Sequence, residues 1–160
     1  LGIGGIKDVN EKFDVIIYSH VFEHILDLCS ELSEIKKRLN ENGVLYIEVP
    51  GVLNLHKNYR NDLNRYFQNS HTYNFSLITL KNVLTTNGFE LINGNENVES
   101  LFKVSNVNNL ITNDYDRLLG EFKKLNFKNK MWVFSIKGIK TLIKSNLYNI
   151  TRKLYRLISS

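Results

Sequence analysis

The feature that most constrains the fold is a pair of apolar segments joined by an amphipathic helical pattern. Phe13–Ser19 is a short, nearly continuous apolar run rich in β-branched residues, as expected for a parallel strand buried on both faces. A second such run, Val44–Val49, is followed by Pro50-Gly51. The segment between them predicts one helix that ends at Asn42-Gly43, with an apolar face made of Ile25, Leu28, Leu32, Ile35 and Leu39. Together these segments predict a βαβ unit.

A long loop and a second helix follow. Residues 52–75 show no clean period, and loops of this length inside a compact domain are usually functional. Ser76 is a suitable cap for a helix from Leu77 to about Asn87, and Gly88 is a suitable stop.

Two further strands are predicted after this helix. Phe89–Ile92 and Ser100–Val104 are apolar runs, and Asn93-Gly94-Asn95 starts a turn between them that favours an antiparallel pair. The expected fold class is therefore α/β, with a mixed sheet of about four strands and flanking helices.

The remaining residues predict helices. One helix is marked by Tyr115, Leu118, Leu119 and Phe122. A second, longer apolar stripe at spacings of three and four consists of Trp132, Ile136, Ile139, Ile143, Leu147, Ile150, Leu154 and Leu157. We expect residues 1–105 to form the α/β part. Residues 106–160 are expected to form a helical extension packed on it or on a partner.

The net charge of +5 is unevenly distributed along the chain. Residues 1–125 hold 13 Lys+Arg and 16 Asp+Glu (−3), whereas residues 126–160 hold 8 Lys+Arg and no acid (+8). This basic region allows either contact with an anionic membrane or packing on the body or another subunit. It includes Lys137, Lys140, Lys144, Arg152, Lys153 and Arg156. Because we find no zinc-finger, RNA-binding or helix-turn-helix pattern, we expect no nucleic acid partner.

Cysteine content and hydropathy indicate the compartment. Cys29 is the only cysteine, so an intramolecular disulfide is excluded and a reducing compartment is favoured. Its neighbours Leu28 and Leu32 predict a small buried thiol. No apolar run reaches the length of about 18 residues needed to span a membrane, and Leu1–Gly5 does not resemble a signal peptide. We expect a cytoplasmic protein, at the membrane periphery if the basic helix binds lipid.

Three segments in order carry a family resemblance. They are Phe13–Ser19 with the following His20-Val21-Phe22-Glu23-His24, then Leu39–Pro50, and then His71–Ser76 with Leu80 and Gly88-Phe89. In this order and spacing they resemble the fourth strand and its loop, the fifth strand, and the approach to the sixth strand of class I S-adenosylmethionine-dependent methyltransferases. The resemblance covers about residues 12–105 and implies part of a Rossmann-like sheet, in a protein of bacterial type.

The resemblance also implies site residues, placed where open α/β sheets bind ligands. Ser19, His20, Val21 and Phe22 would line S-adenosylmethionine. His24 is expected either to deprotonate an acceptor hydroxyl or to make a structural hydrogen bond. His71 is expected to face the acceptor, in a loop that also holds His56 and suits hydroxylated, glycan-like substrates. We expect Glu23 to be an ordinary acid in the first turn of a helix.

The sequence departs from the family upstream of Phe13. The family's glycine-rich cofactor loop follows its first strand and an acid ends its second strand, whereas Leu1–Gly5 follows no strand and lies eight residues before Phe13. We therefore expect a truncated or proteolysed domain, inactive alone, that binds S-adenosylmethionine weakly or not at all.

The segment His20–His24 also spells H-x-x-E-H, the inverted zinc-peptidase motif. That chemistry needs His20 inside a helix, yet the strand pattern runs to Ser19. No helix offers a third ligand, so we expect no metal.

The main interpretation is the C-terminal portion of a methyltransferase that acts on a small-molecule or glycan acceptor. A non-catalytic oligomerisation or interaction module is the alternative, and a zinc hydrolase is a distant third. Because the absent first strand would leave Phe13–Ser19 at an open edge, we also expect a homo-oligomer.

Overall fold

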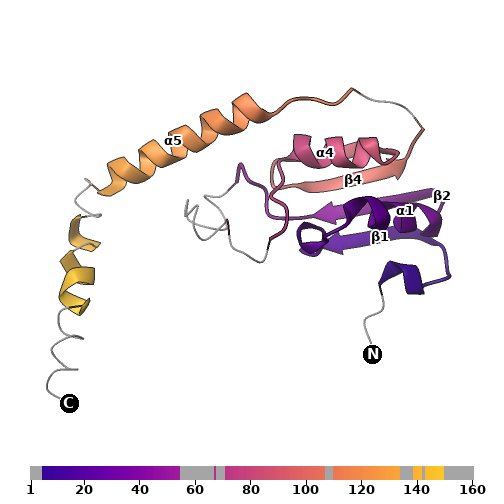
Figure 1. Cartoon of the computed structure of the whole chain (residues 1–160), viewed down its shortest axis with the longest axis horizontal. Coiled ribbons are helices and arrows are strands. Elements are labelled where there is room, and N and C mark those ends of the chain that lie inside the picture. The colour runs from indigo at the N-terminus through magenta and orange to yellow at the C-terminus, as the bar shows by residue number, and fades with distance from the viewer. Residues whose placement is uncertain are drawn as a thin grey trace, which may run out of the picture. The chain divides into compact units, whose positions relative to one another are not determined.

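The computed structural model describes residues 5–54, 67, 71–106, 110–133, 139–141 and 143–149 (Figure 1). The chain divides into two compact units, Leu1–Asp116 and Arg117–Ser160. The first unit contains the sheet, and the second contains most of one long helix and the helical residues that follow it.

The first unit begins with the predicted βαβ arrangement. After one 3-10 turn, η1 (Ile6–Asp8), strand β1 (Phe13–Ser19) leads into a second turn, η2 (Phe22–His24). Helix α1 (Leu28–Arg38) follows, and strand β2 (Leu39–Glu48) returns to pair with β1 in parallel. The parallel pair places the carboxyl ends of β1 and β2 at the same edge of the sheet, with Ser19 opposite Glu48.

The sheet is completed by a hairpin. Helix α4 (Leu77–Thr86) is followed by strands β3 (Phe89–Gly94) and β4 (Glu99–Val104), which pair antiparallel. β4 also pairs antiparallel with β2, so the strand order is β1-β2-β4-β3. Figure 1 shows β1, β2 and β4 side by side in this order. This four-stranded mixed sheet with flanking helices confirms the predicted α/β class and the partial Rossmann-like architecture.

One face of the sheet carries the core. A row of apolar side chains crosses all four strands in register, from Ile16 to Leu45, Phe102 and Leu91. The helices cover this face and contribute to the same core cluster Leu28, Leu32, Ile35, Leu80 and Leu84. Alternation along each strand therefore buries one set of side chains under α1 and α4.

The opposite face is more open. Val15 and Ile17 lie on it and are 51% and 65% exposed, next to the partly buried Val44 and Tyr46 of β2. Within the described part of the chain, the helices that contribute to the core cluster both belong to the other face. β1 therefore presents an apolar surface on the side that α1 and α4 do not cover.

The structure corrects the predicted boundary between α1 and β2. The helix ends at Arg38 rather than at Asn42-Gly43, and β2 begins at Leu39 instead of Val44. The pairing shifts register between Phe13 and Val15, because Leu39 pairs with Phe13 while Val44 pairs with Val15. Gly43 lies in this irregularity, where a Cβ would approach the Phe13 carbonyl oxygen to 2.9 Å. The glycine therefore permits a bulge and does not stop the helix.

Two predictions near α1 were wrong. Cys29 is exposed, because it lies on α1 beside Leu28 and not on the buried stripe. Glu23 is not in the first turn of the helix. Instead it lies in η2, and α1 begins later, at a cap in which the Asp27 carboxylate accepts a hydrogen bond of 3.0 Å from the Ser30 N–H.

Helix α5 (Tyr115–Val133) continues past the position where we expected a second helix to begin at Trp132. Residues 139–141 and 143–149 are also helical. Of the predicted apolar stripe, Ile136, Ile150, Leu154 and Leu157 lie outside the described residues, as do Lys137, Arg152, Lys153 and Arg156. None of the described helices combines the length and apolar character needed to cross a bilayer.

Candidate functional site

Polar side chains gather at the carboxyl ends of β1 and β2. The Ser19 hydroxyl donates a hydrogen bond of 3.0 Å to Glu48 Oε2, and the His20 N–H donates one of 2.8 Å to the Glu48 carbonyl oxygen. These contacts follow from the parallel register, which pairs Ser19 with Glu48. They fix the exit of β1 against the end of β2.

His20 has an unusual backbone conformation at this exit. Its φ of 54° lies in the left-handed region, which residues other than glycine rarely adopt and which is enriched at functional sites. Its ring lies between two carboxylates, with Nδ1 3.8 Å from Glu23 Oε1 and Nε2 3.7 Å from Glu48 Oε1. The chain therefore turns sharply after β1, and His20 lies at the edge of the sheet where β1 and β2 end.

Glu23 is a buried acid in η2. Its residue exposure is 2%, and its Oε1 lies 3.7 Å from His24 Nε2. Its Oε2 is buried and has no hydrogen-bond partner in the part of the chain that the structure describes. Because burial of a carboxylate is costly without compensation, this group is a candidate for binding a proton or a cation.

The segment after the long loop brings His71 to the same place. The Thr72 and Tyr73 N–H groups donate hydrogen bonds of 2.9 and 3.1 Å to the Glu23 carbonyl oxygen. As a result, the rings of His24 and His71 lie edge to face with their centroids 5.0 Å apart. One ligand atom from each of Glu23, His24 and His71 lies within 4.8 Å of the others.

Comparison with known proteins identifies the family. A family model described as a methyltransferase domain matches residues 5–93, more than half of the 160-residue chain. The chain belongs to this methyltransferase family. Its members are class I S-adenosylmethionine-dependent methyltransferases, as the sequence predicted. No curated protein matches the chain.

The methyltransferase site predicted from sequence is only partly accessible to a ligand. Ser19, His20 and Val21 are exposed at the carboxyl end of β1. Phe22, in contrast, is completely buried, with its ring 5.9 Å from that of Tyr18 and 6.0 Å from that of Phe75. Its side chain therefore anchors η2 in the core, and only its backbone could contribute to a cofactor site.

Sequence reasoning missed two acids that lie beside the predicted site residue His20. The first, Glu48, was seen only as a strand residue. Because the carboxyl ends of parallel strands meet at one edge of a sheet, Glu48 could have been predicted to lie beside Ser19. The second, Glu23, was assigned to a helix entrance. Its burial results from the 3-10 turn and the contacts of Thr72 and Tyr73, which no local pattern reveals.

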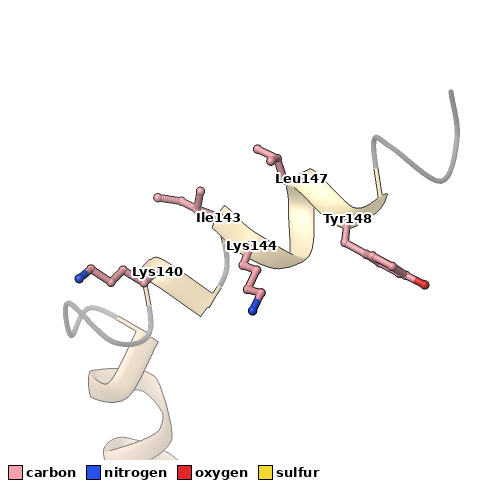
Figure 2. Close-up of a pocket in the computed structure, with 5 residues that line it drawn as sticks. All are labelled: Lys140, Ile143, Lys144, Leu147 and Tyr148. Atoms are coloured by element: carbon pink, nitrogen blue, oxygen red, sulfur yellow. The ribbon is translucent and has the colours of Figure 1, made fainter.

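The second unit of this methyltransferase has an exposed surface of mixed character. Figure 2 shows Ile143 and Leu147 projecting to one side of a helical segment, and Lys144 and Tyr148 toward the other. Lys140 lines the same shallow pocket. Its described lining residues are two lysines, two aliphatic residues and a tyrosine. Membrane contact through this basic segment stays a prediction.

Proposed function

We propose that this chain is the C-terminal portion of a methyltransferase that methylates a hydroxyl group of a small or glycan-like acceptor. The observation that carries the proposal is the meeting of His24 and His71 beside the exit of β1. These histidines come from positions 47 residues apart in sequence, yet two hydrogen bonds to the Glu23 carbonyl hold their segments together. Neither local turn formation nor core packing requires two imidazoles at this place.

The residues at the exit of β1 fit part of a cofactor site. Ser19 offers a hydroxyl group, and the left-handed turn at His20 leaves the backbone near Val21 open to solvent. When bound, S-adenosylmethionine supplies a methyl group on a sulfonium that an acceptor oxygen can attack in line. Ser19, His20 and Val21 would hold this end of the cofactor.

The imidazoles suit the acceptor side of the reaction. A neutral histidine within hydrogen-bond reach of an acceptor hydroxyl can take up its proton near neutral pH. His24 and His71 are the candidates for this role, and Glu23 Oε1 lies 3.7 Å from His24 Nε2. Placement of the hydroxyl would contribute more than base strength, because methyl transfer depends mainly on in-line geometry.

The proposal is tested with His71→Ala in the full-length enzyme. If His71 faces the acceptor, methyl transfer should fall at least about tenfold while the Kd for S-adenosylmethionine changes by less than about twofold. Transfer of a labelled methyl group and calorimetry measure the two effects. Equal losses of thermal stability and activity would make His71 a structural residue and would contradict the proposal.

Cofactor affinity of the 160-residue chain is a second test. The sequence lacks the glycine-rich loop and ribose-binding acid that the family uses, so most of the binding contacts are missing. We expect a Kd of about a millimolar or weaker by calorimetry, at most about 4 kcal/mol of binding. Micromolar binding would show that the cofactor site lies elsewhere in the chain.

A further inference from the structure

The cluster of Glu23, His24 and His71 has the composition of a metal site. Two imidazole nitrogens and one carboxylate oxygen lie within 4.8 Å of one another. This donor set suits zinc and neighbouring divalent transition metals better than Mg²⁺, which prefers oxygen ligands. The hydrogen bonds from Thr72 and Tyr73 to the Glu23 carbonyl hold both parts of the cluster in place without a ligand.

The carboxylate of Glu23 is the second, independent observation. Its side chain is only 3% exposed, and its separations from the neighbouring imidazoles, 3.7 and 3.8 Å, exceed normal hydrogen-bond lengths. Its Oε2 is buried with no hydrogen-bond partner among the described residues. Among the same residues, no lysine or arginine forms an ion pair with it. A buried acid in this situation either keeps its proton or binds a cation, and the two imidazoles beside it supply the further ligands that a cation needs.

We propose that Glu23, His24 and His71 bind one divalent transition-metal ion of the zinc class. Two donor atoms on a tetrahedral zinc ion, each about 2.1 Å from it, are about 3.4 Å apart. The 3.7 Å between Glu23 Oε1 and His24 Nε2 is close to this value. The side chain of His24 is 42% exposed, so its ring has room to adjust.

This ligand set differs from that of the H-x-x-E-H peptidases. There both histidines of the motif bind zinc from one helix and the glutamate activates water. Here His20 is outside the cluster, in a left-handed turn beside Glu48, and His71 supplies the second imidazole from a distant segment. Glu23 is a ligand in this arrangement, so peptidase chemistry does not follow.

Three protein ligands leave one open position on a tetrahedral ion, and a second when the ion becomes five-coordinate. An oxygen atom of a sugar-like diol could occupy the first position and its neighbour the second, which would orient one hydroxyl group for methylation. This role of the open positions rests on the proposed function and would replace proton uptake by His24 and His71, whereas binding of the metal does not depend on that function.

The test is metal binding by the whole 160-residue chain after dialysis against a chelator. Zn²⁺ calorimetry should show one site with a Kd of about ten micromolar or tighter, and Co²⁺ should give a visible absorption band that Zn²⁺ removes. Mg²⁺ should not compete. His71→Ala, His24→Ala and Glu23→Gln should each weaken Zn²⁺ binding by about 100-fold or more, since even outer-shell changes cost 10–100-fold.

Two variants serve as matched controls. His20→Ala removes an imidazole and Glu48→Gln a carboxylate next to the cluster, and both should keep the Zn²⁺ Kd within about threefold. Circular dichroism checks that each variant is folded. If Glu23→Gln does not fold, His71→Ala still tests the site, because His71 is partly exposed and its loss should disturb the fold less. Absence of Zn²⁺ binding, or an equal loss in His20→Ala, would overturn the site. Zn²⁺ binding in a full-length protein without methyl transfer would instead refute only the proposed function.

Discussion

The phenol of Tyr18 connects β1 to α1. Its hydroxyl group donates a hydrogen bond to the Glu31 carboxylate, and its ring meets that of Phe22 edge to face. Burial and the carboxylate of Glu31 raise the pKa of Tyr18 well above its usual value, because both disfavour the phenolate. The free energy of unfolding should therefore depend on pH in the alkaline range, where Tyr18 keeps its proton in the folded state and loses it in the unfolded state.

The sign of this effect predicts loss of stability at high pH. The folded state keeps the Tyr18 proton above pH of about 10, where an unfolded tyrosine releases it, so the free energy of unfolding should fall as pH rises further. The slope should be a fraction of about 1.4 kcal/mol per pH unit, since Tyr18 is only half-buried and partly screened by water. Urea unfolding between pH 8 and 11 measures the slope.

Tyr18→Phe should be less stable than the wild type at pH 8 and should show a smaller slope above pH 10. Tyr115→Phe, at an exposed tyrosine, controls for the loss of one hydroxyl group. An unchanged slope in Tyr18→Phe would assign the alkaline effect to other groups.

At the scale of residues, the sequence indicated which side chains to consider near the exit of β1 but not how they are arranged; their roles stay predictions. His24 and His71 could be chosen because each lies in a segment with family resemblance. The left-handed turn of His20 and the burial of Glu23 could not be predicted. Both depend on the pairing of β1 with β2 and on contacts with residues 72 and 73, which lie far away in sequence.

At the scale of elements, α4 has the strongest local signals. Ser76 and Thr79 form a reciprocal capping box, with Thr79 N–H 3.1 Å from Ser76 Oγ and Ser76 N–H 2.8 Å from Thr79 Oγ1. The Ser76 hydroxyl also donates a hydrogen bond of 2.6 Å to the buried Asp114. The Ser76 side chain therefore caps α4 and also binds Asp114, in the segment that leads to α5.

Ser76→Ala should lower the free energy of unfolding by about 1–2 kcal/mol, at the upper end for an N-cap because Ser76 is fully buried. Chemical denaturation followed by circular dichroism measures the change. The control is Ser33→Ala, at an exposed position within α1, which should change stability by less than about 0.5 kcal/mol. Equal effects at both positions would mean that the cap contributes nothing specific.

Elements with complete local signals were predicted well, and elements shaped by tertiary pairing were not. α4 has an N-cap at Ser76 and ends at Thr86, two residues before Gly88, whose φ is 81°, so its bounds were confirmed to within about one residue. The start of β2 was placed five residues late. Leu39 fits the apolar stripe of α1, and only its pairing with Phe13 makes it a strand residue.

At the scale of the whole molecule, the two edges of the sheet differ. β1 is one edge and exposes Val15 and Ile17 on the open face. β3 is the other edge, where Ile92 is accompanied by polar neighbours such as Glu90 and Asn93. Exposed apolar edge strands recruit other chains, and polar or charged edges resist this. β1 is therefore the edge through which we expect self-association.

We predict a homo-oligomer, most simply a two-fold dimer, that buries β1 or its neighbouring face. Ile17→Lys should shift the mass measured by light scattering to that of a monomer, because a charge would enter the interface. Ile92→Lys, at a comparably exposed residue of the other edge strand, should leave the mass unchanged. A chain ending near Lys128 tests whether the C-terminal helix takes part. A wild-type chain that is monomeric at all concentrations would contradict the prediction.

The antiparallel pairing of β2 with β4 also has a consequence for the time course of folding. Residues 44–48 pair with residues 99–103, so the central ladder of the sheet joins segments that lie far apart in sequence, with α4 and β3 between them. Closing such a loop costs entropy before the contacts form, and topologies with distant pairings fold slowly. During synthesis the βαβ unit leaves the ribosome before the hairpin of β3 and β4, so β2 gains its second neighbour only after residue 104 has emerged. Until then, the apolar strands β1 and β2 are exposed on the nascent chain. This is the interval in which aggregation is easiest and a chaperone would protect the chain most.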